Sequence, residues 1–185
     1  MIIELKTAKD IEFHTREFNR KEWIKSLDNL IDTTINKKEY QLFKNLTTGE
    51  VWTKGGIAQC EITNGNLRLI ETEQRFKNGK TTHRNVQVGG KIPHGVKPEI
   101  CLIQEMHEEI NIDYNFLKHE LDSGNIIFVR KRDFKEPSIM YKGITATYSQ
   151  YLYKWEMPMT HFKTKYIEIA ADKECTFEWV PKESL

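Results

Sequence analysis

The feature that most constrains the fold lies in residues 89–112, where a glycine pair precedes a stretch with helical periodicity. Gly89 and Gly90 come first, and Pro98 suits the opening turn of a helix because its missing N–H has no intrahelical partner there. At about 100° per residue, the later glutamates fall within an arc of roughly 100°. They are Glu105, Glu108 and Glu109. A second arc is apolar: Leu102, Ile103, Met106 and Ile110. The spacing predicts a helix over residues 98–110 that packs its apolar arc on a sheet beside an acidic arc.

The acidic arc lacks neighbouring cations, since residues 98–114 contain no Lys or Arg. Carboxylates three and four residues apart on a helix repel one another by roughly a few tenths of a kcal/mol per pair. One interpretation is a solvated acidic face. The other is a divalent metal site, because hard oxygen ligands suit Mg²⁺ or Mn²⁺. The glycine pair favours the metal site, because a backbone without Cβ can approach a metal or phosphate closely.

The rest of the chain divides into a helical N-terminal arm and a strand-rich remainder. Residues 10–36 repeat apolar side chains at near-helical spacing, so we expect a helical arm over residues 1–38. From residue 39 to 185, β-forming segments alternate with turn signals such as Thr48-Gly49 and Asn64-Gly65. Strands are expected within residues 40–44, 50–53, 57–62, 67–72, 86–88, 126–129 and 145–155, and a strand or helix over 166–171. The pattern predicts a mixed α/β domain.

Composition and cysteine usage limit the classes of protein that fit. Lys and Arg number 28 against 27 Asp and Glu, a net charge of +1, which argues against attachment to nucleic acid by bulk charge. The three cysteines lie far apart without a Cys-x-x-Cys motif, which fits a reducing compartment better than a disulfide framework or zinc site. No apolar stretch approaches a membrane span, and the first residues do not look like a signal peptide. We therefore expect a cytoplasmic or nuclear protein without a membrane partner.

A basic run has two interpretations. Arg130, Lys131, Arg132 and Lys135 lie close together in the sequence. Such a run is either a solvated segment beside a strand or a patch that grips phosphate, and the first is the more common.

Residues Gly90 to Ile112 resemble the 23-residue box of the Nudix hydrolases, Gly-x5-Glu-x7-Arg-Glu-U-x-Glu-Glu-x-Gly-U, in which U is a bulky aliphatic residue. The matching positions are Gly90, Glu105, Met106, Glu108, Glu109 and Ile112. A glycine and three glutamates at these offsets would match by chance on the order of once in 10⁵ starts. The resemblance implies a Nudix-like α/β/α sandwich with a mixed β-sheet over residues 39–185, preceded by the helical arm.

The resemblance also implies a site. Glu105, Glu108 and Glu109, with the Gly89 carbonyl, would hold Mg²⁺ or Mn²⁺, and one glutamate would help to activate the attacking water. Arg84 and Lys91 are candidates for contacts with the substrate. A further glutamate outside the box often joins the metal site in this family, and the candidates here are Glu136, Glu156 and Glu168.

Three positions depart from the box. Val96 stands where the family has a glutamate, Gln104 where it has an arginine, and Asn111 where it has the late glycine. Gln104 offers only a neutral hydrogen bond in place of a charged one. Asn111 tolerates the left-handed geometry that a helix end requires.

Two functions follow from this pattern. The first is metal-dependent hydrolysis of a diphosphate linkage in a nucleoside-diphosphate-linked substrate: a nucleotide derivative, a dinucleotide or an mRNA cap. The alternative is a catalytically weakened Nudix-fold module that binds nucleotide, RNA or protein. The expected partners are a nucleotide-type small molecule or capped RNA. The helical arm would either form a homodimer through Trp23 and Leu27 or cover the sheet.

Overall fold

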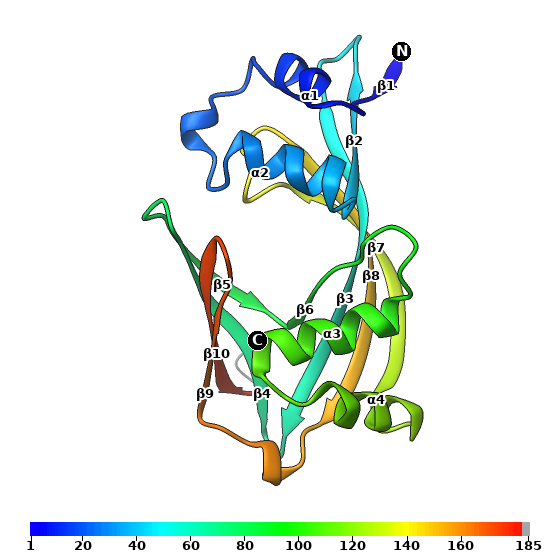
Figure 1. Cartoon of the computed structure of the whole chain (residues 1–185), viewed down its shortest axis with the longest axis vertical. Helices are drawn as coiled ribbons and strands as arrows, with labels where there is room; N and C mark the ends of the chain where they lie inside the picture. The colour runs from blue at the N-terminus through cyan, green and yellow to red at the C-terminus, as the bar shows by residue number, and fades with distance from the viewer. Residues whose placement is uncertain (183–185) are drawn as a thin grey trace. The chain divides into compact units, whose positions relative to one another are not determined.

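A computed structural model describes residues 1–182, and these form two compact units (Figure 1). The first contains residues 1–57, 91–96 and 132–150, and the second contains 58–90, 97–131 and the chain from 151 onward. Each unit combines helices with strands, which confirms the predicted mixed α/β class. Within the described residues, no helix has the length and apolar character needed to cross a membrane.

The first unit pairs short helical segments with a small antiparallel sheet. Strand β1 pairs with β2, and β2 pairs with the first half of β3. Its elements are β1 (Ile2–Glu4), α1 (Ala8–His14), the 3-10 helix η1 (Arg20–Glu22), α2 (Leu27–Ile31), the π-helical turn η2 (Asp32–Asn36) and β2 (Tyr40–Asn45). Three longer strands contribute residues to both units: β3 (Val51–Asn64), β7 (Ile127–Pro137) and β8 (Thr145–Glu156).

The N-terminal arm is helical only in pieces, and the prediction of helical structure across residues 10–36 was too broad. The side chains of Thr7, Asn19 and Ser26 each accept a backbone N–H, so three separate helical segments begin there. Trp23 lies between two of them with 2% of its surface exposed, and its Nε1 donates to the Lys142 carbonyl at 3.0 Å. Trp23 is therefore part of the core of its own unit. A homodimer through this region stays a prediction.

The second unit contains the predicted box helix and a larger sheet. Its strands follow the order β3–β4–β10–β9, with β5 paired to β4 and β6 paired to β3. Its further elements are β4 (Leu67–Phe76), β5 (Thr81–Val86), β6 (Val88–Lys91), α3 (Pro98–Ile110), α4 (Tyr114–Asp122), the 3-10 helix η3 (Met159–His161), β9 (Lys165–Ile169) and β10 (Lys173–Pro181). The segment left open as strand or helix is thus the strand β9.

Helix α4 was not predicted from the sequence. Asp113 caps it, because its carboxylate accepts the backbone N–H of Phe116 at 3.0 Å. The helix has only nine residues, so its apolar repeat covers little more than two turns.

A bulge in β4 decides which side chains share a face of the sheet. Phe177 of β10 lies opposite Glu71, and Cys175 lies opposite Gln74, so the register shifts by one residue at Thr72. Side chains alternate between faces along a regular strand, so without this shift Glu71 and Gln74 would point to opposite faces. With it, both lie on the face of Cys175 and Phe177. Cys175 also lies opposite Glu168 of β9, which brings Glu168 to the same face.

Candidate functional site

Helix α3 has the bounds that the sequence predicted. Pro98 lies in its first turn, and Asn111 ends it in the left-handed conformation, with φ 53° and ψ 45°. The predicted apolar arc is buried, with at most 1% exposure of any member: Leu102, Ile103, Met106 and Ile110. The helix packs against α4 and β9, and Figure 1 shows the two helices following one another in the chain.

The three box glutamates lie in different environments. Glu108 is exposed, Glu105 is half-buried, and Glu109 is buried with 7% exposure. Seven residues make almost two helical turns, so Glu109 lies only about 20° around the helix from Leu102. Because Leu102 faces the core, Glu109 is carried inward with it. A uniformly solvated acidic face, the first interpretation above, does not describe this helix.

Glu105 lies against the glycine pair. A Cβ added to Gly90 would lie 2.4 Å from the Glu105 Cδ, so the carboxylate fills the space that a side chain would need. A Cβ on Gly89 would lie 2.0 Å from the Ala58 carbonyl oxygen and 2.7 Å from the Gln59 Cα. The first glycine therefore lets β6 lie close to β3, and the second brings bare backbone next to a carboxylate of α3.

Glu109 lies among other carboxylates. Burial raises the pKa of Glu109 well above its usual range, and the nearby charges of Glu105, Glu71 and Glu168 raise it further, whereas Lys173 acts in the opposite direction. Burial also raises the pKa of Glu168. The side chains of Glu71, Glu105, Glu108, Glu109 and Glu168 are called the acidic cluster below. They come from β4, α3 and β9.

Glu71 is fixed by two donors. Its Oε1 accepts from Arg84 Nη1 and from Gln74 Nε2, each at 3.0 Å. Glu71 and Gln74 have exposures of only 6% and 2%, so this arrangement is nearly out of reach of solvent. Arg84, a candidate for substrate contact, thus forms an ion pair inside the protein with the acidic cluster.

The chemistry of the acidic cluster fits a divalent cation. It offers only hard oxygen donors, which Mg²⁺ and Mn²⁺ prefer, and the bare backbone of Gly90 leaves room beside Glu105. Among residues 1–182, no three His, Cys, Asp or Glu side chains are already arranged so that they could hold a metal ion. The donor set fits the metal, but the side chains are not gathered around one point.

Gln104 has a different partner from the one expected. Its Nε2 donates to Glu108 Oε1 at 2.6 Å, one helical turn further along α3. In the Nudix box that residues 90–112 resemble, the arginine at this position helps to orient the adjacent glutamate, which is Glu105 here. Because residues four apart share a helix face, the short amide reaches Glu108.

Other candidates from the sequence have contacts outside the acidic cluster. Lys91 belongs to the first unit, where its Nζ lies 5.0 Å from the centroid of the Tyr40 ring. Glu136, also in the first unit, accepts from the Tyr148 hydroxyl at 3.0 Å. Glu156 accepts from the Thr63 hydroxyl and from the Gly65 N–H. Of the three glutamates considered outside the box, Glu168 is the one whose charge acts on Glu109.

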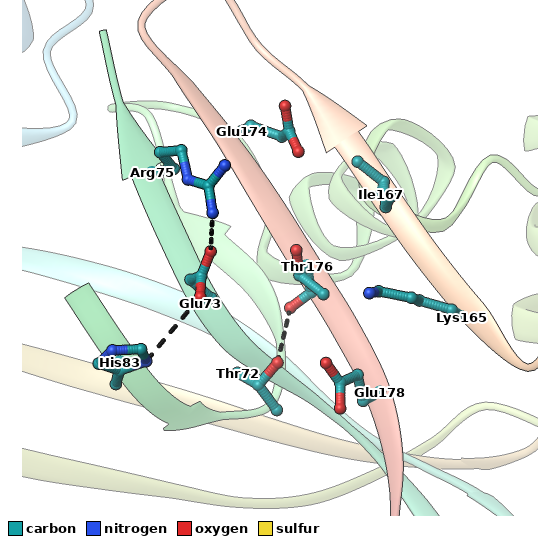
Figure 2. A pocket seen from close by; sticks show the side chains of 9 residues that line it. All are labelled: Thr72, Glu73, Arg75, His83, Lys165, Ile167, Glu174, Thr176 and Glu178. Atoms are coloured by element: carbon teal, nitrogen blue, oxygen red, sulfur yellow. Dashed lines mark hydrogen bonds and ion pairs between the residues drawn. The ribbon is translucent and has the colours of Figure 1, made fainter. Parts of the chain in front are cut away.

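A pocket of about 400 Å³ lies on the opposite face of the same sheet (Figure 2). Thr176 lines it and alternates with the buried Cys175 and Phe177 along β10, which places the pocket and the acidic cluster on different faces. Glu73 in this pocket pairs with Arg75 at 3.2 Å and with His83 at 4.0 Å, as Figure 2 shows. The lining contains no box residue.

Sequence reasoning missed Glu71 and Gln74. One signal was available for Glu71, which follows Leu67 and Leu69 at the strand period of two and therefore points to the same side as Leu69. Leu69 is buried, and Glu71, on the same side of the strand, is buried as well. No comparable signal exists for Gln74, because its side depends on the bulge at Thr72.

Comparisons with known proteins give distant matches. No family model matches the chain. A binary complex of an Ap4A hydrolase from C. elegans aligns with 15% identity over 70% of this chain and 81% of that chain, with a TM-score of 0.42. Another structure of a C. elegans Ap4A hydrolase gives 14% identity over 70% and 81%, with a TM-score of 0.38. A bifunctional NMN adenylyltransferase/ADP ribose pyrophosphatase from Francisella tularensis gives 18% identity over 71% of this chain and 34% of that chain, with a TM-score of 0.43. Because all three TM-scores lie below 0.5, the function proposed below is based on the residues of the acidic cluster.

Proposed function

We propose that the protein is a metal-dependent hydrolase of diphosphate linkages in nucleoside-diphosphate-linked substrates. The observation that carries the proposal is the acidic cluster itself: half-buried Glu105 lies against the bare backbone of Gly90, and buried Glu109 lies behind it. The same residues are those in which residues 90–112 resemble the Nudix box. A purely structural role would not explain several carboxylates with few counter-charges at a glycine pair.

Glu105, Glu108 and Glu109, with the Gly89 carbonyl, would hold Mg²⁺ or Mn²⁺. The bound metal would lower the pKa of its water and neutralise charge on the diphosphate. Gln104 keeps the exposed Glu108 in place through its hydrogen bond. Burial raises the pKa of Glu109 in the metal-free protein, so a bound cation would offset the cost of keeping this carboxylate ionised. One of the glutamates would help to activate the attacking water. Arg84 and Gln74 hold Glu71 in a fixed position behind this group.

The test is a release assay with Mg²⁺ or Mn²⁺ and a panel of diphosphate substrates: nucleotide sugars, dinucleoside polyphosphates, nucleoside triphosphates and capped RNA. We expect release of nucleoside monophosphate or phosphate from at least one class, and loss of that activity in Glu109→Gln. Glu136→Gln is the matched control, because Glu136 is bonded to Tyr148 in the first unit.

Turnover that is equal in the parent and in Glu109→Gln would contradict the proposal. An inactive parent that still binds a nucleotide, with equal affinity in Glu109→Gln, would favour the alternative of a binding module. Thermal stabilisation by nucleotide in the absence of metal measures that binding independently of turnover.

A further inference from the structure

Strand β7 exposes a basic and aromatic surface that the proposed hydrolysis does not use. Phe128 is 52% exposed, and Ile127 and Val129 beside it are 55% and 42% exposed. Arg130 and Lys131 follow directly and are exposed as well. Strand β7 pairs only with β8 among the described residues, so one side of it is a free sheet edge.

Two tyrosines of β8, the strand paired with β7, contact side chains of this part of β7. The rings of Phe128 and Tyr153 lie 5.4 Å apart in an edge-to-face arrangement, and Tyr153 is buried with 5% exposure. The Lys131 Nζ lies 5.5 Å from the centroid of the Tyr151 ring. Tyr153 thus contacts the Phe128 ring, and about half of the Phe128 surface stays exposed. Phe128, Arg130, Lys131, Tyr151 and Tyr153 are called the β7 strip; all belong to the second unit.

The cations of the β7 strip have no carboxylate partner. Within residues 1–182, neither Arg130 nor Lys131 forms an ion pair, whereas exposed Lys118 pairs with Asp122 at 3.1 Å. Residues 127–131 contain no acid. Arg130 and Lys131 are neighbours on a strand and therefore point to opposite faces; the ring contact places Lys131 on the side of Tyr151, so Arg130 points to the other side. Two unneutralised cations thus flank the free edge of β7, close in sequence to an exposed aromatic ring.

The β7 strip adjoins the start of helix α3. Burial raises the pKa of Tyr153 to about 12, and the charge of Glu99 in the first turn of α3 acts in the same direction. Cys101 of that helix has its Sγ 4.0 Å from the Gly90 carbonyl. Within the second unit, Tyr153 is therefore within electrostatic reach of the first turn of α3.

We propose that the β7 strip binds single-stranded polynucleotide. Phosphodiesters would contact Arg130 and Lys131, and a base would stack on Phe128, which is the combination that sequence-independent single-strand binding uses. Cations also protect a free sheet edge from pairing, but that role leaves the adjacent exposed apolar residues unexplained. An acidic peptide added to the edge would meet the cations and leave the Phe128 ring without a specific partner. The inference goes beyond the proposed hydrolysis and does not depend on it.

Fluorescence anisotropy with labelled oligouridylate and oligodeoxythymidylate of equal length tests this binding. EDTA is present throughout, so hydrolysis plays no part and its absence would not affect the result. We expect the parent to bind, with affinity that falls as salt rises. Removing both cations in Arg130→Ala/Lys131→Ala should weaken binding and make the slope of log K against log salt shallower by about 1.4, or about 0.7 for each lost phosphate contact.

The aromatic contribution has a different signature. Phe128→Ala should weaken binding by roughly 5- to 160-fold at unchanged salt slope, the factor that corresponds to the loss of one stacked base. The double variant Lys77→Ala/Lys118→Ala removes the same charge from elsewhere in the second unit and should keep the parent's affinity and slope. Circular dichroism and thermal midpoints check that the variants fold.

Each outcome decides the inference. Equal affinity for the two oligomers would mean that the β7 strip binds single strands of either kind. Tighter binding of oligouridylate would mean that it prefers RNA. Both results support the inference. A parent that does not bind, a cation variant that binds like the parent, or a control that loses as much as the cation variant would overturn it. Displacement by polyglutamate at the same concentration of charge would also overturn it, because peptide carboxylates would then satisfy the surface equally well.

Discussion

Burial of Glu109 makes the stability of the metal-free protein depend on pH. The pKa of Glu109 is raised in the folded state, above all by burial, so the folded protein binds this proton more tightly than the unfolded chain does. An unfolded glutamate titrates near pH 4.3, and above that pH the unfolded chain releases the proton while the folded protein still holds it. The free energy of unfolding should therefore fall as pH rises from that value towards the raised pKa of Glu109.

The size of this pH dependence follows from the single proton that the Glu109 carboxyl retains in the folded state. The free energy of unfolding changes by at most about 1.4 kcal/mol per pH unit for each proton that only the folded state retains. For a chain of this length, 1 kcal/mol shifts the unfolding midpoint by roughly 2–4 °C, so Glu109 should lower it by roughly 3–6 °C per pH unit. The pKa of Glu168 is also raised, by burial first, and adds a slope of the same sign. The difference between the parent and Glu109→Gln isolates Glu109.

Differential scanning fluorimetry with EDTA, from about pH 5 to pH 8, measures how the unfolding midpoint changes with pH. This range lies above the pKa of an unfolded glutamate, so a carboxyl group whose pKa is raised by folding affects the midpoint there. Glu109→Gln should be more stable than the parent at the upper end and should vary less with pH. Glu136→Gln is the matched control, because Glu136 is exposed and belongs to the first unit, and its variant should keep the parent's slope. With Mg²⁺ in place of EDTA, at 100 times Kd, the free energy of unfolding of the parent should rise by about 2.7 kcal/mol and its midpoint should rise accordingly, whereas Glu109→Gln should gain much less. A parent whose midpoint falls no more steeply with pH than that of Glu109→Gln would refute the burial of an acid at this position.

Three further predictions test the site and its support. Leu102→Ala should lower the free energy of unfolding by roughly 2–5 kcal/mol in a urea titration, because Leu102 is fully buried; Ile127→Ala at an exposed position should change it little. Gly90→Ala should lower turnover on the order of 10²-fold while the protein stays folded, because the added Cβ would displace the Glu105 carboxylate; turnover equal to the parent would contradict the placement of Glu105. Val96→Glu with Gln104→Arg restores both departures from the box and should raise turnover or lower the metal concentration needed; a repaired protein that is slower than the parent would contradict the reasoning.

The sequence predicts α3 well because its signals are local. Proline at the start, asparagine at the end and two arcs at helical spacing all lie within residues 98–111, and the structure has the same bounds. Several strands are predicted in position and underestimated in length: β7 extends to Pro137, well past the expected end at residue 129. Strands β1, β5 and β10 were not predicted. An exposed strand rich in charge has no apolar alternation to reveal its length.

The acidic cluster could be predicted only in part, because two of its five carboxylates come from segments distant in sequence. The box residues share one helix, so their spacing is visible in the sequence. Glu71 and Glu168 are almost a hundred residues apart and come together because both β4 and β9 pair with β10. A single-residue bulge at Thr72 decides which β4 side chains face α3, and register shifts of this kind leave no pattern in the hydrophobic periodicity. The exposure of each glutamate likewise follows from the docking of α3 and not from its sequence.

The balance of charge in the acidic cluster distinguishes between the two interpretations of the acidic arc of α3, a solvated acidic face and a divalent metal site. Five carboxylates belong to it, and the cations that act on its buried members are Arg84, paired with Glu71, and Lys173. Burying ionised carboxylates without partners costs several kcal/mol, so such a cluster either takes up a proton or binds a cation. The raised pKa of Glu109 is the first of these responses. If protonation were sufficient, a glutamine at position 109 would serve equally well and Mg²⁺ would stabilise both proteins to the same extent. If the ionised form has a function, Mg²⁺ must compete with the proton, and its stabilising effect on the parent must grow as pH rises.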